Sequence, residues 1–553
     1  MNDAFASDAN SPASDVAVRE FRQVVLYPLQ LVPVQGRAQT AANWEWLMAL
    51  DCAWHDAGDL LACAEGTLAE RHYTEFVAFM PDVQRFLYGE ARNVAGAPHY
   101  GSSPIRVFRR SDAATAEVTL RRGEPPLVFE VSRIELFFFY DIDLAMFAIE
   151  IVGTDLTLAQ VQDCLFRFGR AYPTGWDEDG SGSHCCQSVR WLDREGRTLA
   201  ASDFGQKEPY LATVAEHRAP RLAAHWSYLL DPLAPQHPGS VGTIPYRQVE
   251  QHRMALLAYI AVDHPTRIGR DDWVRLGLVA PPGRPGSSPF GSSFLSDFEA
   301  RYCYDRFWDL SRGHDQVPTR MICSGRSLIM VGDAASANFV DGERGILAKF
   351  RHQYLLLALI VHFHRATLLA FRDRLVSAMS MLSDYSAPTV KRFKREIRLT
   401  HENFLRFTHR YWFNEVSNQA PVRDLFDRWV VQLGTARLFA EVREEVKDMI
   451  DYLESDELRR QANSVVRLTV VTFFGLIGTV VTGFLGMNLI DLTQASLPAK
   501  ALYFIGVMIP VSALTFYTAA KSQRLSEFLE AVSDPRLPLR FKLRALARVW
   551  RQG

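Results

Sequence analysis

Two long apolar runs without any charge lie near the end of the chain, at residues 468–490 and 501–520. A helix rises about 1.5 Å per residue, so each run is long enough to cross a hydrocarbon core of about 30 Å. A buried helical hairpin in a soluble protein is the disfavoured alternative, because adjacent uncharged runs of this length are rare in soluble chains. The pattern predicts transmembrane helices at residues 463–490 and 501–520, joined by an outer loop at 491–500.

Basic residues on the two flanks of this pair predict its orientation. Arg459, Arg460 and Arg467 precede the first run, and Lys521 and Arg524 follow the second. Because Lys and Arg are enriched on the cytoplasmic side of membrane helices, both termini are expected in the cytoplasm. We therefore expect a multi-pass protein of the cell (inner) membrane that contacts membrane lipids.

Upstream of the spans, several stretches have the patterns of strands or of amphipathic helices. Strands are predicted at residues 21–33, 105–110, 116–121, 127–139, 144–152 and 320–331. Helices are predicted at residues 43–92, from Asp155 or Thr157 to about residue 170, at 345–381, at 387–416 and from Pro421 onward. A strand-rich block followed by helices predicts an α+β domain.

The predicted parts of the chain follow from these patterns and from local composition. They are a disordered N-terminus at 1–17, an α+β cytoplasmic domain at 18–344, a helical region with a stalk helix at 345–462, the two spans with their outer loop, and a basic cytoplasmic tail at 521–553. Residues 1–17 lack the basic and apolar regions of a signal peptide. Helical patches joined by Pro- and Gly-rich stretches predict a helical insertion near residues 200–318 of the α+β domain.

The helix that starts near Pro421 is expected to continue into the first span, with Gly434 tolerated inside it. Apolar residues recur along it every three or four positions, which is a heptad-like seam. The seam consists of Phe439, Val442, Val446, Met449 and Leu453. Acidic residues occupy the other faces of this helix, where they could attract cations or form an ordinary solvated face.

A stripe of small, hydroxyl and leucine side chains follows one side of the first span. Its members are Leu468, Thr472, Gly475, Leu476, Thr479, Gly483 and Gly486. Such a stripe could line a narrow aqueous path. It could also serve close helix–helix packing, which membrane helices favour at Gly and Thr, and the stripe alone favours packing.

The first span closes with Gly486, Met487 and Asn488 at its predicted outer end. This tripeptide at the end of the penultimate span, followed by a short outer loop, resembles the CorA-type magnesium transporter family. The resemblance extends over roughly residues 425–520. The chain departs from the family near Ile477, where the family usually has a proline.

The resemblance implies a funnel-like homo-oligomer, a homopentamer, in which five copies of Asn488 surround one axis. Gly486, Met487 and Asn488 would form the ion selectivity site, with Asn488 meeting the hydrated metal ion. Magnesium sheds its waters reluctantly, and amide carbonyls accept hydrogen bonds from those waters without binding the ion too tightly. The pore-lining residues would be Leu468, Thr472, Leu476, Thr479 and Gly483.

Two other groups of residues are candidate metal ligands. The loop at 177–186 has the acid spacing of the start of an EF-hand, but Ser188 stands where the bidentate Glu belongs, so a solvated turn is predicted. His362 and His364 fall on different faces of a helix, so packing or surface histidines are predicted instead of a ligand pair.

Net charge and cysteine content exclude further classes of protein. A formal net charge of −2 is too balanced to indicate a nucleic-acid partner. Seven scattered cysteines give no disulfide framework, which agrees with a reducing cytoplasm for most of the chain. No covalent chemistry and no tightly bound cofactor are implied, so the protein is not predicted to be an enzyme.

The sequence therefore predicts a divalent-cation channel or transporter, with magnesium as the leading candidate for the transported ion and for a regulatory ion. Leu468 and Leu476 would be apolar constrictions that close the path by dewetting. A zinc, cobalt or nickel transporter of the same family is the near alternative, because Asp491 is the one acidic residue of the outer loop. A membrane-anchored sensor or scaffold with a vestigial pore is the alternative from a different class.

Overall fold

The computed structural model of the chain describes most of its length. The described residues are 16–32, 43–58, 60, 70–89, 104–139, 142–236, 244–283, 289–308, 318–381, 387–487 and 496–520. The chain divides into two compact units, Met1–Val446 and Lys447–Gly553.

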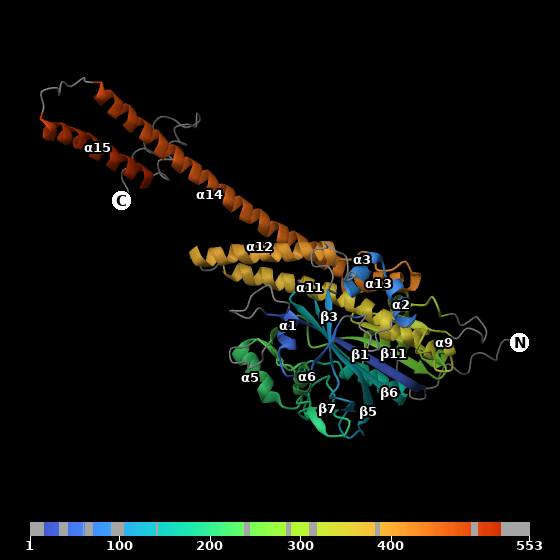
Figure 1. The fold of residues 1–553 in the computed structure, drawn as a ribbon. Helices are drawn as coiled ribbons and strands as arrows, with labels where there is room; N and C mark the ends of the chain where they lie inside the picture. The colour runs from blue at the N-terminus through green and yellow to red at the C-terminus, as the bar shows by residue number, and fades with distance from the viewer. Residues whose placement is uncertain are drawn as a thin grey trace. The chain divides into compact units, whose positions relative to one another are not determined.

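Three long antiparallel strands form the middle of the sheet in the first unit (Figure 1). Strand β1 (Ala17–Leu31) pairs with β6 (Leu144–Thr157) along one edge and with β11 (Ala255–Val262) along the other. Strand β5 (Leu127–Phe139) pairs antiparallel with β6. Val, Ile and Phe dominate these strands, and such side chains pack well on a pleated surface.

Shorter strands extend the sheet on both sides, giving 14 strands in the order β12-β13-β14-β11-β1-β6-β5-β4-β7-β8, with β2, β3, β9 and β10 off this path. Their bounds are β2 (His55–Gly58), β3 (Ile105–Arg110), β4 (Thr115–Thr119), β7 (Ser188–Leu192), β8 (Thr198–Ala201), β9 (Leu233–Pro235), β10 (Ile244–Gln248), β12 (Cys303–Tyr304), β13 (Arg320–Cys323) and β14 (Ser327–Asp333). Most neighbours are antiparallel, and β11 runs parallel to β14. The mixed architecture confirms the predicted α+β class.

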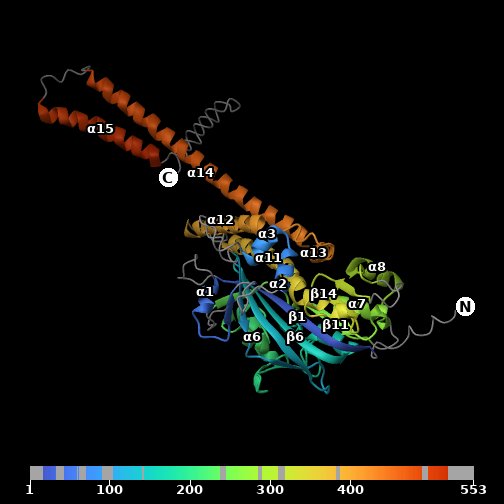
Figure 2. The same cartoon turned by 45° about the vertical axis from the view of Figure 1, so that its right-hand side comes forward.

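Helices cover both faces of the sheet (Figure 2). Up to β14 they are α1 (Asn43–Met48), α2 (Glu70–Val77), α3 (Pro81–Tyr88), α4 (Leu158–Arg167), α5 (Lys207–His217), α6 (Ala224–Leu230), the 3-10 turn η2 (Pro265–Arg267), α7 (Arg270–Leu278) and α8 (Ser292–Tyr302). After β14 they are α9 (Ala337–Val340), α10 (Ile346–Lys349), the π-helical turn η3 (Phe350–Tyr354), α11 (Leu355–Ser380), α12 (Ala387–Arg410), α13 (Ala420–Leu433), α14 (Thr435–Gly486) and α15 (Leu497–Ala520).

Neighbouring residues of β5 show that both faces of the sheet are buried. Phe139 stacks on Phe363 of α11 with ring centroids 4.2 Å apart. Phe138 points to the other face, where its ring meets Phe108 edge-on at 5.5 Å. Because successive strand side chains alternate between faces, a strand covered on both sides needs apolar residues at nearly every position.

Several predicted elements agree with the structure at residue level. The strands at 105–110 and 127–139 have the predicted bounds, and β1, β4 and β6 lie within a few residues of theirs. Thr157 caps α4 as one of the two predicted caps. Its hydroxyl accepts a hydrogen bond from the Gln160 amide, and the Gln160 side chain accepts one from the Thr157 amide. This reciprocal pair satisfies two amides that the first turn leaves unpaired.

Three predicted elements differ from the structure. The helix expected at 43–92 is broken into α1, strand β2, α2 and α3 within its described residues. The strand expected at 320–331 is a hairpin of β13 and β14 that turns at Gly325, whose φ is +86°. Residues 200–318 are not a separate helical insertion, because β11 lies in the middle of the sheet between β1 and β14.

One buried helix has the composition of a membrane span. The most apolar window of the helical stretch Ile346–Ser380 has a mean hydropathy of 1.6, yet 89% of this window is buried inside the protein. It therefore serves as a core helix of the first unit, between the sheet and the helices α12 and α13. An apolar helix can be covered by protein as well as by lipid, and composition alone does not separate the two cases.

A buried carboxylate ties the sheet to this helical layer. Glu150 of β6 is fully buried, and Arg22 Nη1 and Arg133 Nε lie 3.2 and 2.8 Å from its oxygens. Arg351 of η3 lies at 4.0 Å, and Arg133 also donates to the Arg351 carbonyl at 2.9 Å. Burial opposes ionisation, but the three guanidinium groups hold the pKa of Glu150 below its ordinary 4.5.

Glu150→Gln is expected to lower the free energy of unfolding by about 3 kcal/mol, because it leaves three arginines facing an uncharged amide. The lowered pKa means that the native charge contributes stability above about pH 4.5 and that this contribution is lost as the pH falls below it. The variant should lack this acid-dependent loss. Urea unfolding at pH 7 and at pH 4 would measure both effects. Glu195→Gln is the matched control, because Glu195 pairs with Arg197 in solvent and should change little.

Candidate functional site

The chain turns sharply just before its longest helix. Gly434 has φ +65° and caps the end of α13, and α14 begins at the next residue. The predicted stalk is therefore two helices, and the prediction that Gly434 lies inside one continuous helix is wrong. A left-handed residue ends a helix, and glycine adopts that conformation without steric cost.

The first turns of α14 pack within their own unit. Phe439 stacks on Trp412 with ring centroids 4.3 Å apart, and on Phe404 of α12 at 5.8 Å. Val442 and Val446 are buried as well. These three residues of the predicted seam therefore contribute to the core of the first unit.

In the second unit, α14 and α15 lie side by side (Figure 1). Gly478 marks their closest contact: a β-carbon there would lie 2.8 Å from Val511 Cγ1. No other atom of the described structure would come within 4 Å of a β-carbon at Gly475, Gly483 or Gly486. Of these four glycines, Gly478 alone is needed for the contact with α15.

The predicted pore-lining stripe lies on a different side of α14. With about 100° per residue, the stripe is centred roughly 120° around the helix from Gly478. Leu468 is 67% exposed and Leu476 is 63% exposed. Thr472, Thr479 and Gly483 are exposed as well. Within a single chain, therefore, α15 leaves the stripe uncovered.

The threonines of α14 share one hydrogen-bond pattern. Thr472 Oγ1 donates to the Leu468 carbonyl at 2.8 Å, and Thr479 Oγ1 donates to the Gly475 carbonyl at 2.9 Å. Because each hydroxyl proton is used in this bond, the oxygen turns its remaining lone pairs outward. The exposed hydroxyls on the stripe therefore act as hydrogen-bond acceptors toward whatever faces them.

The end of the first span is described in part. Gly486 is the last residue of α14 and Met487 follows in a turn, 73% exposed. Asn488 and the predicted outer loop up to residue 495 lie outside the described residues.

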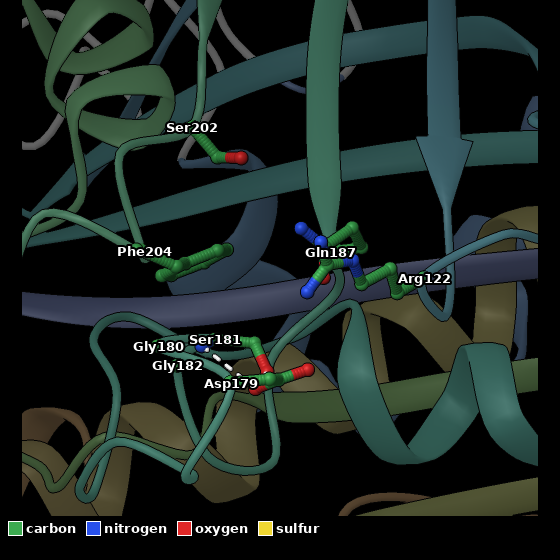
Figure 3. Close-up of a pocket in the computed structure, with 9 residues that line it drawn as sticks. Arg122, Asp179, Gly180, Ser181, Gly182, Gln187, Ser202 and Phe204 are labelled. Atoms are coloured by element: carbon green, nitrogen blue, oxygen red, sulfur yellow. Dashed lines mark hydrogen bonds between the residues drawn. The ribbon is translucent and has the colours of Figure 1, made fainter.

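The acidic loop at 177–186 forms a compact turn with a shallow cavity of about 330 Å³ beside it (Figure 3). Asp179 accepts a hydrogen bond from the Ser181 amide, and Ser183 Oγ donates to Asp177. Arg122 and Gln187 line the cavity from the opposite side. The described residues contain no group of three or more His, Cys, Asp or Glu that could hold a metal.

The two histidines of α11 belong to the core. Burial lowers the pKa of His364 to about 4, and its Nε2 lies 2.6 Å from the Tyr411 carbonyl oxygen. Burial, together with Arg365 and Arg326, lowers the pKa of His362 to about 3, and its ring packs edge-on against Trp429. Both are neutral at pH 7 and pack within the core.

A comparison with protein families bears on the C-terminal part of the chain. The family model described as CorA-like Mg2+ transporter protein matches residues 370–520. Residues 370–520 form a CorA-like domain. This CorA-like region contains most of α12 to α15 and part of α11, so it includes both the predicted stalk and the two apolar helices.

Other comparisons add little to the CorA-like region. No curated protein matches the chain. The solved structure of the full-length CmaX protein is similar with 12% identity, over 49% of this chain and 89% of that one, at a TM-score of 0.16. A likeness at so low a TM-score carries no argument.

The apolar surface of the CorA-like region agrees with a membrane protein. The most apolar window of the stretch Thr435–Val480 has a mean hydropathy of 1.5 and is 13% buried, and Leu497–Ala513 is a shorter apolar helix. Large apolar side chains stand exposed on both helices, among them Phe473, Val480, Leu502 and Ile509. Such a surface is stable where lipid or another subunit covers it. The sequence located these helices but did not identify Gly478 as the contact between them.

Gly478→Val is expected to destabilise the α14–α15 pair, because its side chain would enter the space of Val511. Gly475→Val is the matched control, since a β-carbon at Gly475 meets no atom within 4 Å. Thermal unfolding of the purified protein in detergent should show a lower midpoint for the first variant alone. Equal losses in the two variants would contradict the assigned contact face.

Proposed function

We propose that this protein is a divalent-cation channel that conducts magnesium through an oligomeric pore lined by α14. The observation that carries the proposal is the uncovered stripe of small and hydroxyl side chains on the first apolar helix of a CorA-like region. The CorA-like family transports divalent cations, so a pore is the function to which such a stripe is best suited. The proposal involves no covalent chemistry.

The chemistry of the stripe supports passage of a hydrated ion. Waters bound to Mg²⁺ point their hydrogens outward, so the path must offer acceptors. Thr472 and Thr479 present outward lone pairs because their own protons bind backbone carbonyls. In an oligomer, Leu468 and Leu476 of all subunits would each surround the path with apolar side chains. A narrow apolar constriction can close the path by losing its water.

The selectivity site in this proposal is a ring of Asn488 amides at the outer end of α14. Neutral amide oxygens attract hydrated cations less strongly than carboxylates, which allows an ion to enter and to leave. Gly486 and Met487 would shape the turn that presents the ring. Two helices from one chain cannot enclose a pore, so the proposal requires an oligomer, for which the resemblance to the CorA-type family implies five subunits. The basic residues that flank the spans favour both termini in the cytoplasm.

Asn488→Ala is expected to abolish magnesium uptake into proteoliposomes that contain the purified protein, because the ring would lose its acceptors. Uptake of zinc, cobalt and nickel, measured separately, would identify a different cargo for the same pore. Absence of flux for every ion in well-folded wild-type oligomers, with and without internal magnesium, would overturn the channel proposal. A sensor or scaffold role for the large first unit would then take its place.

Thr479→Val is expected to reduce uptake about tenfold, because it replaces an acceptor on the stripe by a methyl group of the same shape. Thr482→Val is the control, since Thr482 makes the same kind of bond, to the Gly478 carbonyl at 2.9 Å, on the side nearer α15. Initial uptake rates at matched protein density would compare the two. A larger loss in the Thr482 variant would place the ion path on another side of α14.

A further inference from the structure

A cluster of arginines gathers at one end of the sheet in the first unit, far in sequence from the proposed pore. Arg253 lies two residues before the start of β11, and Arg326 directly precedes β14. Because β11 and β14 are parallel neighbours, residues that precede them lie at the same edge of the sheet. Arg170 joins them through an isolated antiparallel bridge to Arg253.

Backbone carbonyls hold the three arginines in place. Arg326 Nη1 donates to the Arg253 carbonyl at 2.8 Å, and Arg170 Nε donates to the Phe166 carbonyl at 3.0 Å. Arg253 Nη2 donates to the carbonyls of Leu278 and Val279 at 3.0 and 2.6 Å. These bonds fix the side chains but neutralise none of their charge.

Arg170 is the most unusual member of the cluster. It is only 4% exposed, and no carboxylate of the described residues lies within ion-pair distance of it. Its two terminal nitrogens donate to no described residue and keep some contact with solvent. Fully buried arginines are almost always paired, because an unpaired buried charge is costly.

Neighbouring acids do not balance the cluster. Glu250 lies 3.8 Å from Arg326, but it also lies 3.2 Å from Arg365. Asp163 is the partner of Arg121 and Arg167. Each carboxylate is thus shared between two arginines.

The nearby thiols do not supply negative charge either. Burial raises the pKa of Cys185 to about 12 and that of Cys186 further, so both are neutral at pH 7. The excess of positive charge also lowers the pKa of Arg253, a member of the cluster. Burial and the other two arginines lower the pKa of Arg253 to about 10.

The pKa of His252 is lowered by the same cluster of positive charges. Its pKa is lowered to about 4. Burial is the main cause, and electrostatic interactions with Arg170, Arg326, Arg253 and His184 lower it further. Its ring lies beside Tyr172, with centroids 6.1 Å apart, and is only partly buried. At pH 7 it is therefore a partly exposed, neutral imidazole close to three charged guanidinium groups.

We propose that Arg170, Arg253 and Arg326, with His252 at the rim, form a binding site for the phosphate group of a small molecule. Guanidinium groups bind phosphate oxygens through paired, charge-assisted hydrogen bonds, and several converging on one position favour a multiply charged anion. A bound phosphate would supply the negative charge that the described neighbours of Arg170 lack. The site stands independently of the proposed pore.

The place of the site in the fold links it to the end of α13. Arg326 follows Gly325 in the β13–β14 turn, and the Gly325 carbonyl accepts a hydrogen bond from Trp429 Nε1 of α13. Arg365, which shares Glu250 with Arg326, donates to the Leu433 carbonyl at 2.7 Å. An anion bound to Arg326 would thus contact the turn that holds the residues just before Gly434.

Isothermal titration of the full-length protein in detergent tests the site directly, with inorganic phosphate, AMP and chloride as separate ligands. We expect saturable binding of phosphate or AMP, and the tighter of the two identifies free phosphate or a nucleotide as the source. Arg170→Gln and Arg253→Gln should each weaken binding about tenfold or more. Arg197→Gln, which alters an exposed surface pair, should bind as the wild type does.

A measurement on the wild type avoids any folding defect in the variants. The ring signal of ¹³C-labelled His252, assigned with His252→Gln, should titrate near pH 4 without phosphate and closer to 6.5 when phosphate is bound. The proposal is overturned by an unchanged His252 titration together with no binding heat. Equal binding of chloride, or unaltered affinity in both arginine variants, would overturn it as well.

Discussion

Apolar side chains must be kept from water, and the described part of the chain contains two helices long and apolar enough to cross a membrane that meet this requirement differently. Ile346–Ser380 is covered by the sheet and by neighbouring helices of its own unit. The second, in α14, leaves its apolar surface bare in a single chain apart from the contact at Gly478. Membrane lipid and neighbouring subunits are the environments in which that surface is stable. The division into two units follows from this difference.

The joint at Gly434 lies between two helix ends that both pack in the first unit. Before it, α13 is held by bonds from Trp429 to the β13–β14 turn and from Arg365 to the Leu433 carbonyl. After it, Phe439 anchors the start of α14 on aromatic rings of the first unit. A left-handed glycine therefore sits between two well-packed helix ends.

Buried charge in the first unit falls into two kinds. Glu150 meets three arginines, which joins the sheet to the α11 layer and leaves the carboxylate ionised. Arg170 has no such partner among the described residues, although it is buried nearly as deeply. The first arrangement is structural, because the charges form ion pairs with one another within the fold. The second arrangement is the one expected of a binding site, where a ligand supplies the negative charge that pairs with the arginine.

Local pattern was enough to predict the α+β class, the bounds of β3 and β5, Thr157 as one of two candidate caps of α4, and the apolar helices α14 and α15. It could not show that β11 lies in the middle of the sheet, since strand order depends on contacts between distant residues. Nor could it show that Gly478 faces α15 while the stripe with Thr472 and Thr479 does not. Only the tertiary structure brought Arg170, Arg253 and Arg326 together, because segments far apart in sequence meet at one edge of the sheet.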